Sequence, residues 1–259
     1  MSGQAQAMKS DIILEVDGLR TYIQTERGMV RCVDGADLRL RRGETLGLVG
    51  ESGCGKTMMA RSIMGLVDDA PGVIDGSIQF CADDGQQFDL TQGLGEGCGF
   101  RSGSNSHFEI DKDMRRWKRG VLELYRPLWG RHLSIIFQDP QTSLNPYWSV
   151  GEQLREAITI GRRPDELDDD EIHRESLDWM DRVHISFPER VLGNFAHELS
   201  EGMCQRIMIA IALASRPDLV IADEPTTGLD VTIQARIVEL FKELRQELGR
   251  TVLLISHDM

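Results

Sequence analysis

The chain has 259 residues, of which 41% are hydrophobic, and it carries a formal net charge of −13. This length and apolar content suffice for one large domain, or for a domain with a subdomain, whereas the negative charge argues against a nucleic-acid surface, which normally carries a basic stripe. Five cysteines without a C-x-x-C pair favour reduced thiols, no apolar run reaches the roughly 18 residues of a membrane span, and residues 1–10 lack the apolar core of a secretory signal.

The N-terminal part predicts β structure after an expected disordered tail at residues 1–10. From Ile12 to Val49, short apolar segments alternate with turn residues such as Glu26-Arg27-Gly28. This alternation indicates a small antiparallel β layer. The last of these segments, Glu44–Val49, predicts a short buried strand that leads into a glycine-rich sequence.

That glycine-rich sequence, Gly50-Glu51-Ser52-Gly53-Cys54-Gly55-Lys56-Thr57, fits the pattern G-x-x-x-x-G-K-[S/T]. It stands between the predicted strand and a predicted helix at Met58–Met64, a context that disfavours a chance glycine-rich turn. Glycines let successive N–H groups converge on phosphate oxygens at the positive end of the helix dipole. Lys56 is expected to reach the β- and γ-phosphates, and the Thr57 hydroxyl to ligate Mg²⁺. The sequence therefore predicts a nucleotide site.

The next stretch, Gly85–Gly103, contains six glycines and predicts a long flexible loop. Cys81, Cys98 and His107 could be considered as metal ligands, but their irregular spacing favours an interpretation as loop residues. Asp111–Tyr125 predicts a helix with five lysines and arginines, which we interpret as a solvated basic face.

The second half of the chain alternates strands and helices. Its predicted strands are apolar on both faces, which indicates a parallel α/β sheet. An acidic run, Asp165–Glu171, is interpreted as a solvated loop and helix start, and apolar residues at helical spacing predict a helix at Ile237–Leu248. The other elements are a strand at His132–Phe137, mainly helical structure at Val150–Glu198, a buried helix at Ile207–Leu213, and strands at Asp218–Glu224 and Thr251–His257.

Polar residues at the ends of these strands predict the rest of a hydrolytic site. Asp223 can hold Mg²⁺, and Glu224 can orient or deprotonate an attacking water. Gln138 has the length and the neutral amide to contact both that water and the metal. His257 can donate a hydrogen bond to the γ-phosphate. Acids and histidines at strand ends are often structural, so these roles gain weight from the whole set rather than from any one residue.

Taken together, these motifs resemble the ATPase subunits of ABC transporters in order and spacing, from about Ile13 to the last residue. Phe137–Pro146 and Ile221–Thr227 look like the dipeptide/oligopeptide/nickel importer branch of that family. The segments that carry the resemblance are Gly50–Thr57, Gln138, Leu199–Met203, Asp223-Glu224, Gly228–Asp230 and His257.

The resemblance implies an α/β fold of the P-loop NTPase type, with a parallel-sheet core, an N-terminal antiparallel β layer and an inserted helical subdomain. The expected core comprises residues 11–138 and 207–259, with a flexible insertion at about 81–130. The expected helical signature subdomain comprises residues 139–206.

The resemblance also implies a head-to-tail dimer with an identical or homologous ATPase subunit, with two ATP molecules and their Mg²⁺ ions at the interface. Ser200 and the Gly202 amide would contact the γ-phosphate held by the other subunit, and Asp230 would organise the opposite site. Tyr22 would stack on adenine, or would equally serve as a core residue. The region around Gln138 would meet a coupling helix of one of two permease subunits, at the cytoplasmic face of the membrane. A solute-binding protein would take part indirectly, and nucleic acid would not.

Two departures from the family pattern affect this expectation. Glu201 replaces the first of the two signature glycines, and we expect its carboxylate to face solvent or a basic neighbour such as Arg206, with activity retained. The sequence also stops two residues after His257, where members of this branch continue, so a fragment or an interrupted gene product is expected.

The expected function is ATP binding and hydrolysis that drives peptide import. Nickel and antimicrobial-peptide uptake are alternatives within transport. A soluble ABC ATPase of DNA repair or translation is disfavoured, because paired ATPase domains and a long coiled coil are absent from this sequence. An inactive remnant is favoured by the early end of the chain and disfavoured by the intact Lys56, Glu224 and His257.

Overall fold

The computed structural model of the protein describes residues 11–67, 71–92, 98–102, 108–162, 167–226 and 229–257. The chain forms two compact units. One comprises residues 1–42, 48–128 and 257–259, and the other comprises residues 43–47 and 129–256. The expected tail at residues 1–10 lies outside the described residues. The expected division into a core and a helical subdomain remains a prediction.

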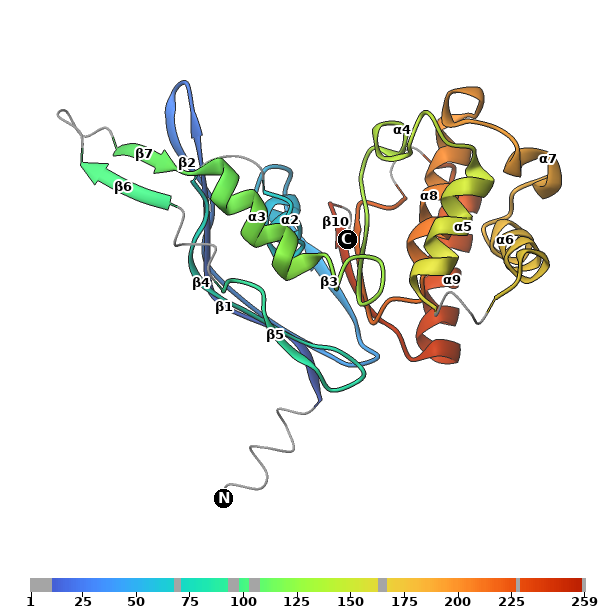
Figure 1. Ribbon diagram of the computed structural model, residues 1–259, viewed down its shortest axis with the longest axis horizontal. Helices are drawn as coiled ribbons and strands as arrows, with labels where there is room; N and C mark the ends of the chain where they lie inside the picture. Colours follow the sequence, from blue (N-terminus) through green and yellow to red (C-terminus); the bar gives the residue numbers. More distant parts are fainter. Residues whose placement is uncertain are drawn as a thin grey trace, which may run out of the picture. The chain divides into compact units, whose positions relative to one another are not determined.

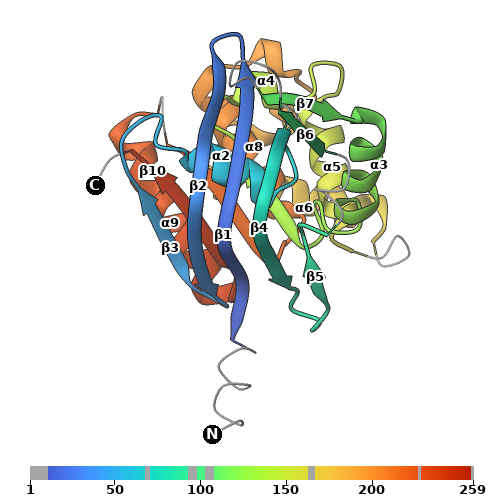
Figure 2. The same ribbon diagram turned by 90° about the vertical axis from the view of Figure 1, so that its left-hand side faces the viewer.

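An antiparallel sheet with strand order β2-β1-β4-β5 dominates the first unit (Figure 2). Apolar residues of β1, including Leu14, Val16 and Leu19, are fully buried, and they provide the apolar face that a half-buried sheet requires. The predicted antiparallel β layer is therefore confirmed. The strands are β1 (Ile12–Thr25), β2 (Gly28–Arg41), β4 (Pro71–Cys81) and β5 (Gln87–Asp89).

Two helices and a two-stranded pair complete the first unit. The helix α2 (Lys56–Ile63) lies behind the sheet in Figure 2, where the Ser62 hydroxyl contacts the Thr21 hydroxyl of β1 at 2.7 Å. The helix α3 (Met114–Tyr125) ends at a buried tyrosine, and the Tyr125 hydroxyl donates to the Leu90 carbonyl at 3.2 Å. The strands β6 (Cys98–Ser102) and β7 (Phe108–Lys112) pair antiparallel.

The glycine-rich stretch at Gly85–Gly103 contains strands, so the prediction of one long loop was wrong. Both β5 and β6 fall within it, because backbone pairing there outweighs the low strand propensity of glycine. The helix predicted from Asp111 begins at Met114, because the Asp113 side chain caps it and β7 extends to Lys112. No cluster of metal-ligating side chains occurs among the described residues, and His107 lies outside them.

A second sheet, with strand order β3-β10-β9-β8, organises the other unit. The strands β8, β9 and β10 pair in parallel, which confirms the predicted parallel α/β sheet. All five residues of β9 are buried, as expected for a strand covered on both faces. The strands are β3 (Thr45–Val49), β8 (Leu133–Ile136), β9 (Leu219–Asp223) and β10 (Thr251–Ser256). The prediction of a buried Glu44–Val49 was wrong, because β3 is an edge strand and Val49 is 47% exposed.

Helices supply most of the remaining structure of the second unit, on the right of Figure 1. The helix α8 is buried nearly all round, with Ile207, Ile209 and Ala210 at 0% exposure, as its apolar sequence predicts. The helices are α4 (Pro140–Ser143), α5 (Val150–Ile160), α6 (Asp169–Arg182), α7 (Pro188–Leu192), η2 (Ala196–Glu198, a 3₁₀ turn), α8 (Glu201–Ala214) and α9 (Val231–Leu248). Within the described residues, no helix has the length and apolarity needed to cross a membrane.

Candidate nucleotide site

The glycine-rich sequence forms the turn between β3 and α2. Gly53 and Gly55 adopt left-handed backbone angles, with φ of 82° and 99°, a region that glycine enters without steric cost. A Cβ on Gly55 would lie 2.2 Å from the Cys32 carbonyl oxygen of β2. Gly55 therefore has two independent reasons to be glycine, and β2 supports the turn from one side.

Lys56 lies over this turn as the first residue of α2. Its ammonium donates to the carbonyl oxygens of Gly50 at 2.6 Å and Glu51 at 2.9 Å, and its side chain is largely buried. Gly55, the N-cap residue of α2, provides no side-chain cap, so no carboxylate or hydroxyl of the cap competes for the positive end of the helix. A tight glycine turn, a fixed ammonium and a helix N-terminus fit the charge and shape of nucleotide phosphates. Thr57, the expected Mg²⁺ ligand, is in the first turn of α2.

Tyr22, the expected adenine-stacking residue, is a half-buried residue of β1. Its hydroxyl donates to an Asp34 carboxylate oxygen at 2.6 Å, and this bond raises the pKa of the phenol. The Arg31 guanidinium lies 5.6 Å from the ring centroid, which is within cation–π range. The ring is thus fixed by two neighbours from β2, and its role towards a base remains a prediction.

Gln138 and Glu224 meet at the carboxyl ends of two neighbouring strands in the second unit. In the parallel register, Ile136 of β8 pairs with Ala222 of β9, and each functional residue follows two positions later. The Gln138 amide nitrogen donates to a Glu224 carboxylate oxygen at 2.9 Å. The sequence predicted both residues for one site, and the structure brings them into direct contact.

The backbone of Glu224 turns sharply where β9 ends. Glu224 has a φ of 50°, which is left-handed and costly for a residue with a Cβ. Its N–H donates to the Ile255 carbonyl of β10 at 3.0 Å. Asp223 is buried at the end of β9, in register with Ile255. His257 is exposed and follows directly after β10.

The predicted signature residues occupy the start of α8. Ser200 is the N-cap residue, and its hydroxyl accepts from the Met203 N–H at 3.4 Å. A Cβ on Gly202 would lie 3.4 Å from a methyl group of Leu229, so this glycine permits close packing against the segment before α9. Asp230 accepts from the Ile233 N–H at 3.0 Å, which makes it a capping residue of that helix.

Glu201 is exposed, in agreement with the expectation that its carboxylate faces solvent. Of the two expected surroundings, solvent or a basic neighbour such as Arg206, the structure shows the first, because the described residues include no ion pair between Glu201 and Arg206. The Arg206 guanidinium donates instead to the carbonyl oxygens of Gly202, Val183 and His184. These carbonyls lie within reach of the side chain, and burial lowers the pKa of Arg206.

Two glutamines that the sequence did not single out hold the segment between Glu224 and Asp230. Gln205 of α8 donates to the Pro225 carbonyl at 2.8 Å. Gln234 of α9 donates to the carbonyls of Thr226 and Leu229, both at 3.1 Å. Polar residues near the start of apolar helices are a weak signal for such contacts, and nothing in their spacing identifies these partners.

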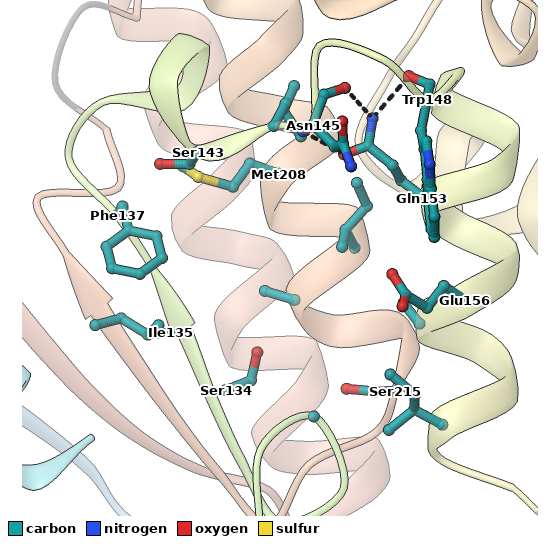
Figure 3. A pocket seen from close by; sticks show the side chains of 16 residues that line it. Ser134, Ile135, Phe137, Ser143, Asn145, Trp148, Gln153, Glu156, Met208 and Ser215 are labelled. Atoms are coloured by element: carbon teal, nitrogen blue, oxygen red, sulfur yellow. Dashed lines mark hydrogen bonds between the residues drawn. The ribbon is translucent and has the colours of Figure 1, made fainter. Parts of the chain in front are cut away.

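A groove of about 410 Å³ lies in the second unit beside the strand that leads to Gln138 (Figure 3). Phe137 of the β8 end and Met208 of α8 contribute apolar surface, and Trp148 is 40% exposed. The Gln153 side chain fixes the rim, because it donates to the carbonyls of Asn145 and Trp148, both at 3.1 Å, and accepts from the Asn145 N–H at 2.9 Å.

The expected site residues thus fall in two sets, one in each unit. The first unit holds the glycine-rich turn Gly50–Thr57, Tyr22 and His257. The second holds the contact between Gln138 and Glu224 together with the signature residues. In the second set, Asp223 is buried and Asp230 caps α9. The roles of the residues in both sets remain predictions.

Comparison with known proteins agrees with these observations. A family model described as ABC transporter matches residues 33–227. The chain is 39% identical, over 95% of its length, to the oligopeptide transport ATP-binding protein AppD of Bacillus subtilis (strain 168), and it covers 65% of that protein. It is also 39% identical over 95% of its length to the glutathione import ATP-binding protein GsiA of Pectobacterium atrosepticum, of which it covers 35%. The chain therefore spans about two thirds or less of these relatives.

A solved structure shares the fold. The dimeric ATP-binding cassette MJ0796, in a post-hydrolysis state bound to ADP and Pi, matches 95% of this chain and 88% of its own chain, with a TM-score of 0.68 and 22% identity. The family match spans the phosphate-type loop, Gln138, Ser200 and Glu224. The chain belongs to the ABC transporter family.

Proposed function

We propose that this protein is the ATP-binding and ATP-hydrolysing subunit of an importer for peptides. The contact between Gln138 and Glu224 carries the proposal, because it holds a carboxylate at the carboxyl edge of a parallel sheet. That edge is where α/β proteins place ligand groups. In the same chain, Lys56 and the Gly50–Thr57 turn provide a phosphate-binding element.

The chemistry divides between binding and water activation. The turn and Lys56 bind the phosphates of ATP, and Thr57, Gln138 and Asp223 are the residues suited to hold Mg²⁺. Bound Mg-ATP supplies the scissile phosphate bond and the charge of the metal. Glu224 orients the attacking water and takes its proton, while Gln138 fixes the carboxylate. His257 donates a hydrogen bond to the terminal phosphate.

A head-to-tail dimer completes the proposed site. Ser200 and the Gly202 amide then act on the nucleotide of the opposite subunit, and Asp230 organises that contact. The description of MJ0796 as dimeric supports a dimer by similarity of fold, and the head-to-tail arrangement is part of the proposal.

The test of hydrolysis is steady-state turnover of the wild type and of Glu224→Gln. The amide keeps the shape of the side chain but cannot accept a proton, so we expect ATP binding to persist and turnover to fall by about 10²–10⁴-fold. ATP should then accumulate a dimer of the variant in size-exclusion chromatography. Wild-type turnover in Glu224→Gln would move the role of base to another residue.

The groove beside Gln138 is the proposed docking site for an amphipathic helix of a membrane-embedded permease, at the cytoplasmic face. Trp148 lines the groove and is 40% exposed, and its sequence neighbour Tyr147, outside the lining, is 86% exposed. Large exposed aromatic residues of this kind are common anchors at interfaces. Co-purification with the permease should be lost in Trp148→Glu. Phe187→Glu is the matched control, because Phe187 is an 80% exposed aromatic that does not line the groove.

Peptides are the proposed cargo because relatives described as oligopeptide and glutathione transport proteins match 95% of this chain. The measurement is uptake of labelled oligopeptide, glutathione and Ni²⁺ by cells that carry the transporter, with and without this subunit. Loss of peptide uptake alone is the expected result. Loss of Ni²⁺ uptake alone would favour the nickel alternative.

A further inference from the structure

The turn at Glu224 needs support from outside its own backbone. Its left-handed φ of 50° is unfavourable for a residue with a Cβ. A strained conformation persists only when its surroundings hold it. The Ile255 carbonyl accepts from the Glu224 N–H on one side, and the other side of the turn is the peptide that begins at Pro225.

Gln205 supplies that second support. Its amide nitrogen donates to the Pro225 carbonyl at 2.8 Å, and its side chain is 1% exposed. Proline has no N–H of its own, so the carbonyl is the polar backbone group through which Pro225 can be held. The contact spans 20 residues of sequence and joins α8 to the residue directly after Glu224.

The environment of Gln205 indicates that stability alone does not explain this side chain. Its amide oxygen is buried and has no hydrogen-bond partner. An unpaired buried acceptor lowers the free energy of unfolding, whereas an apolar residue of the same size would not have this cost. Gln205 therefore places a polar amide in the core although only the amide nitrogen makes a hydrogen bond. A buried, half-satisfied amide beside a strained acidic residue points to a role in fixing that residue.

Ser200 is the N-cap residue of the helix that carries Gln205. Five residues of regular helix thus join the N-terminus of α8 to the amide that holds Pro225. A displacement of the N-terminus of α8 also moves the Gln205 amide, because an α-helix transmits position along its axis with little distortion.

We infer that Gln205 is a positioning residue for hydrolysis, which holds Glu224 in its left-handed turn and links the geometry of that carboxylate to the start of α8. This inference rests on the proposed function for the role of Glu224, and it adds a positioning residue to that role. Gln205 acts through the Pro225 carbonyl and contacts no reacting atom.

The test is Gln205→Met, which keeps the length of the side chain and removes both the donor and the unpartnered acceptor. A misplaced catalytic group of this kind lowers kcat by about 10²-fold, so we expect a loss of that order with the KM for ATP unchanged. Because Gln205 acts through Glu224, the double variant Gln205→Met/Glu224→Gln should turn over no more slowly than Glu224→Gln alone.

A second readout does not depend on turnover. Hydrogen exchange of the segment Ile221–Asp230, measured without nucleotide, should be faster in Gln205→Met than in the wild type. Ser176→Ala is the matched control, because it removes another buried hydrogen bond, from the Ser176 hydroxyl to the Ile172 carbonyl at 2.8 Å in α6. That variant should keep wild-type kcat and wild-type exchange in this segment.

Three results would overturn the inference: unchanged exchange in Gln205→Met, an unchanged kcat, or an additional loss of kcat in the double variant. An equal loss in Ser176→Ala would also overturn it, since the effect would then be general destabilisation. Failure of the proposed function has a different signature. In that case Glu224→Gln keeps wild-type turnover, while exchange of the segment still reports on the Gln205 contact.

Discussion

The glycine-rich turn Gly50–Thr57 and the turn at Glu224 both require a left-handed backbone angle, and they reach it with different residues. Both place a residue in the left-handed region, at φ of 99° for Gly55 and 50° for Glu224. The first turn uses glycine, which enters this region without cost. The second uses a glutamate, which enters it only under restraint. Restraint is present, from Ile255 through the Glu224 N–H and from Gln205 through the next carbonyl.

The difference agrees with the function proposed for each turn. At Gly55 the backbone would bind phosphate, so no side chain is needed there. At Glu224 the carboxylate would activate water, and a glutamate is present in spite of the left-handed φ of 50°. Residues with strained backbone cluster at functional sites, and the strain at Glu224 is consistent with the chemical role proposed for its side chain. Strain alone does not identify that role, because His184, Phe187 and Arg216 also have a positive φ.

The largest expected effect comes from adding one methyl group to the glycine turn. Gly55→Ala adds left-handed strain and a clash with the Cys32 carbonyl, which would lie 2.2 Å from the new Cβ. We expect a loss of about 3 kcal/mol in the free energy of unfolding, with nucleotide binding abolished. Gly53→Ala is the control, because its φ of 82° brings strain but no neighbour lies within 4 Å of the new Cβ. Gly53→Ala should lower the free energy of unfolding by about 1 kcal/mol. Equal losses in Gly53→Ala and Gly55→Ala would show that the clash with the Cys32 carbonyl contributes nothing.

At Glu224, by contrast, introducing glycine is expected to relieve backbone strain. Glu224→Gly should be more stable than Glu224→Ala by about 1 kcal/mol, because only glycine relieves the left-handed strain. Both variants should lack turnover. Denaturant unfolding measures the difference. At an unstrained site the alanine variant is the more stable of the two. That result at Glu224 would show that its turn is not strained.

A smaller effect is expected at Glu201, which occupies a glycine position of the signature. Its side chain is exposed at the first turn of α8, where a carboxylate interacts favourably with the helix dipole. Glu201→Gly should therefore change ATPase activity by no more than a few-fold. A gain of about a hundredfold, or about 2.7 kcal/mol of barrier, would mean that this charge cripples the native site.

Prediction from sequence succeeded where local chemistry sets the structure. The glycine turn and the strand that ends at Asp223 follow from motif spacing, and the common edge at which parallel strands end places Gln138 and Glu224 in one region. Their direct hydrogen bond was not predicted. The strain at Glu224 could not be predicted, because a glutamate gives no sign of a left-handed φ. The Gln205 contact was also hidden, because it depends on how α8 packs near the end of β9, which is a tertiary property.

The misjudged regions have a similar cause. Glycine content at Gly85–Gly103 predicted a loop, but pairing of β5 with β4 and of β6 with β7 gives strands, since sheet propensity depends on neighbours. The burial of β3 was overestimated, because its apolar sequence does not reveal that it forms a sheet edge in this chain.

The claim that the Gly50–Thr57 turn binds nucleotide through Lys56 is tested most directly by calorimetric titration of Mg-ATP into the wild type and Lys56→Ala. The variant loses the ammonium that lies over the turn at 2.6 Å from the Gly50 carbonyl, and backbone N–H groups alone remain to bind phosphate. We expect saturable binding by the wild type and an affinity lower by at least about a hundredfold, or 2.7 kcal/mol, in the variant. Equal affinity in the two proteins would contradict the assignment.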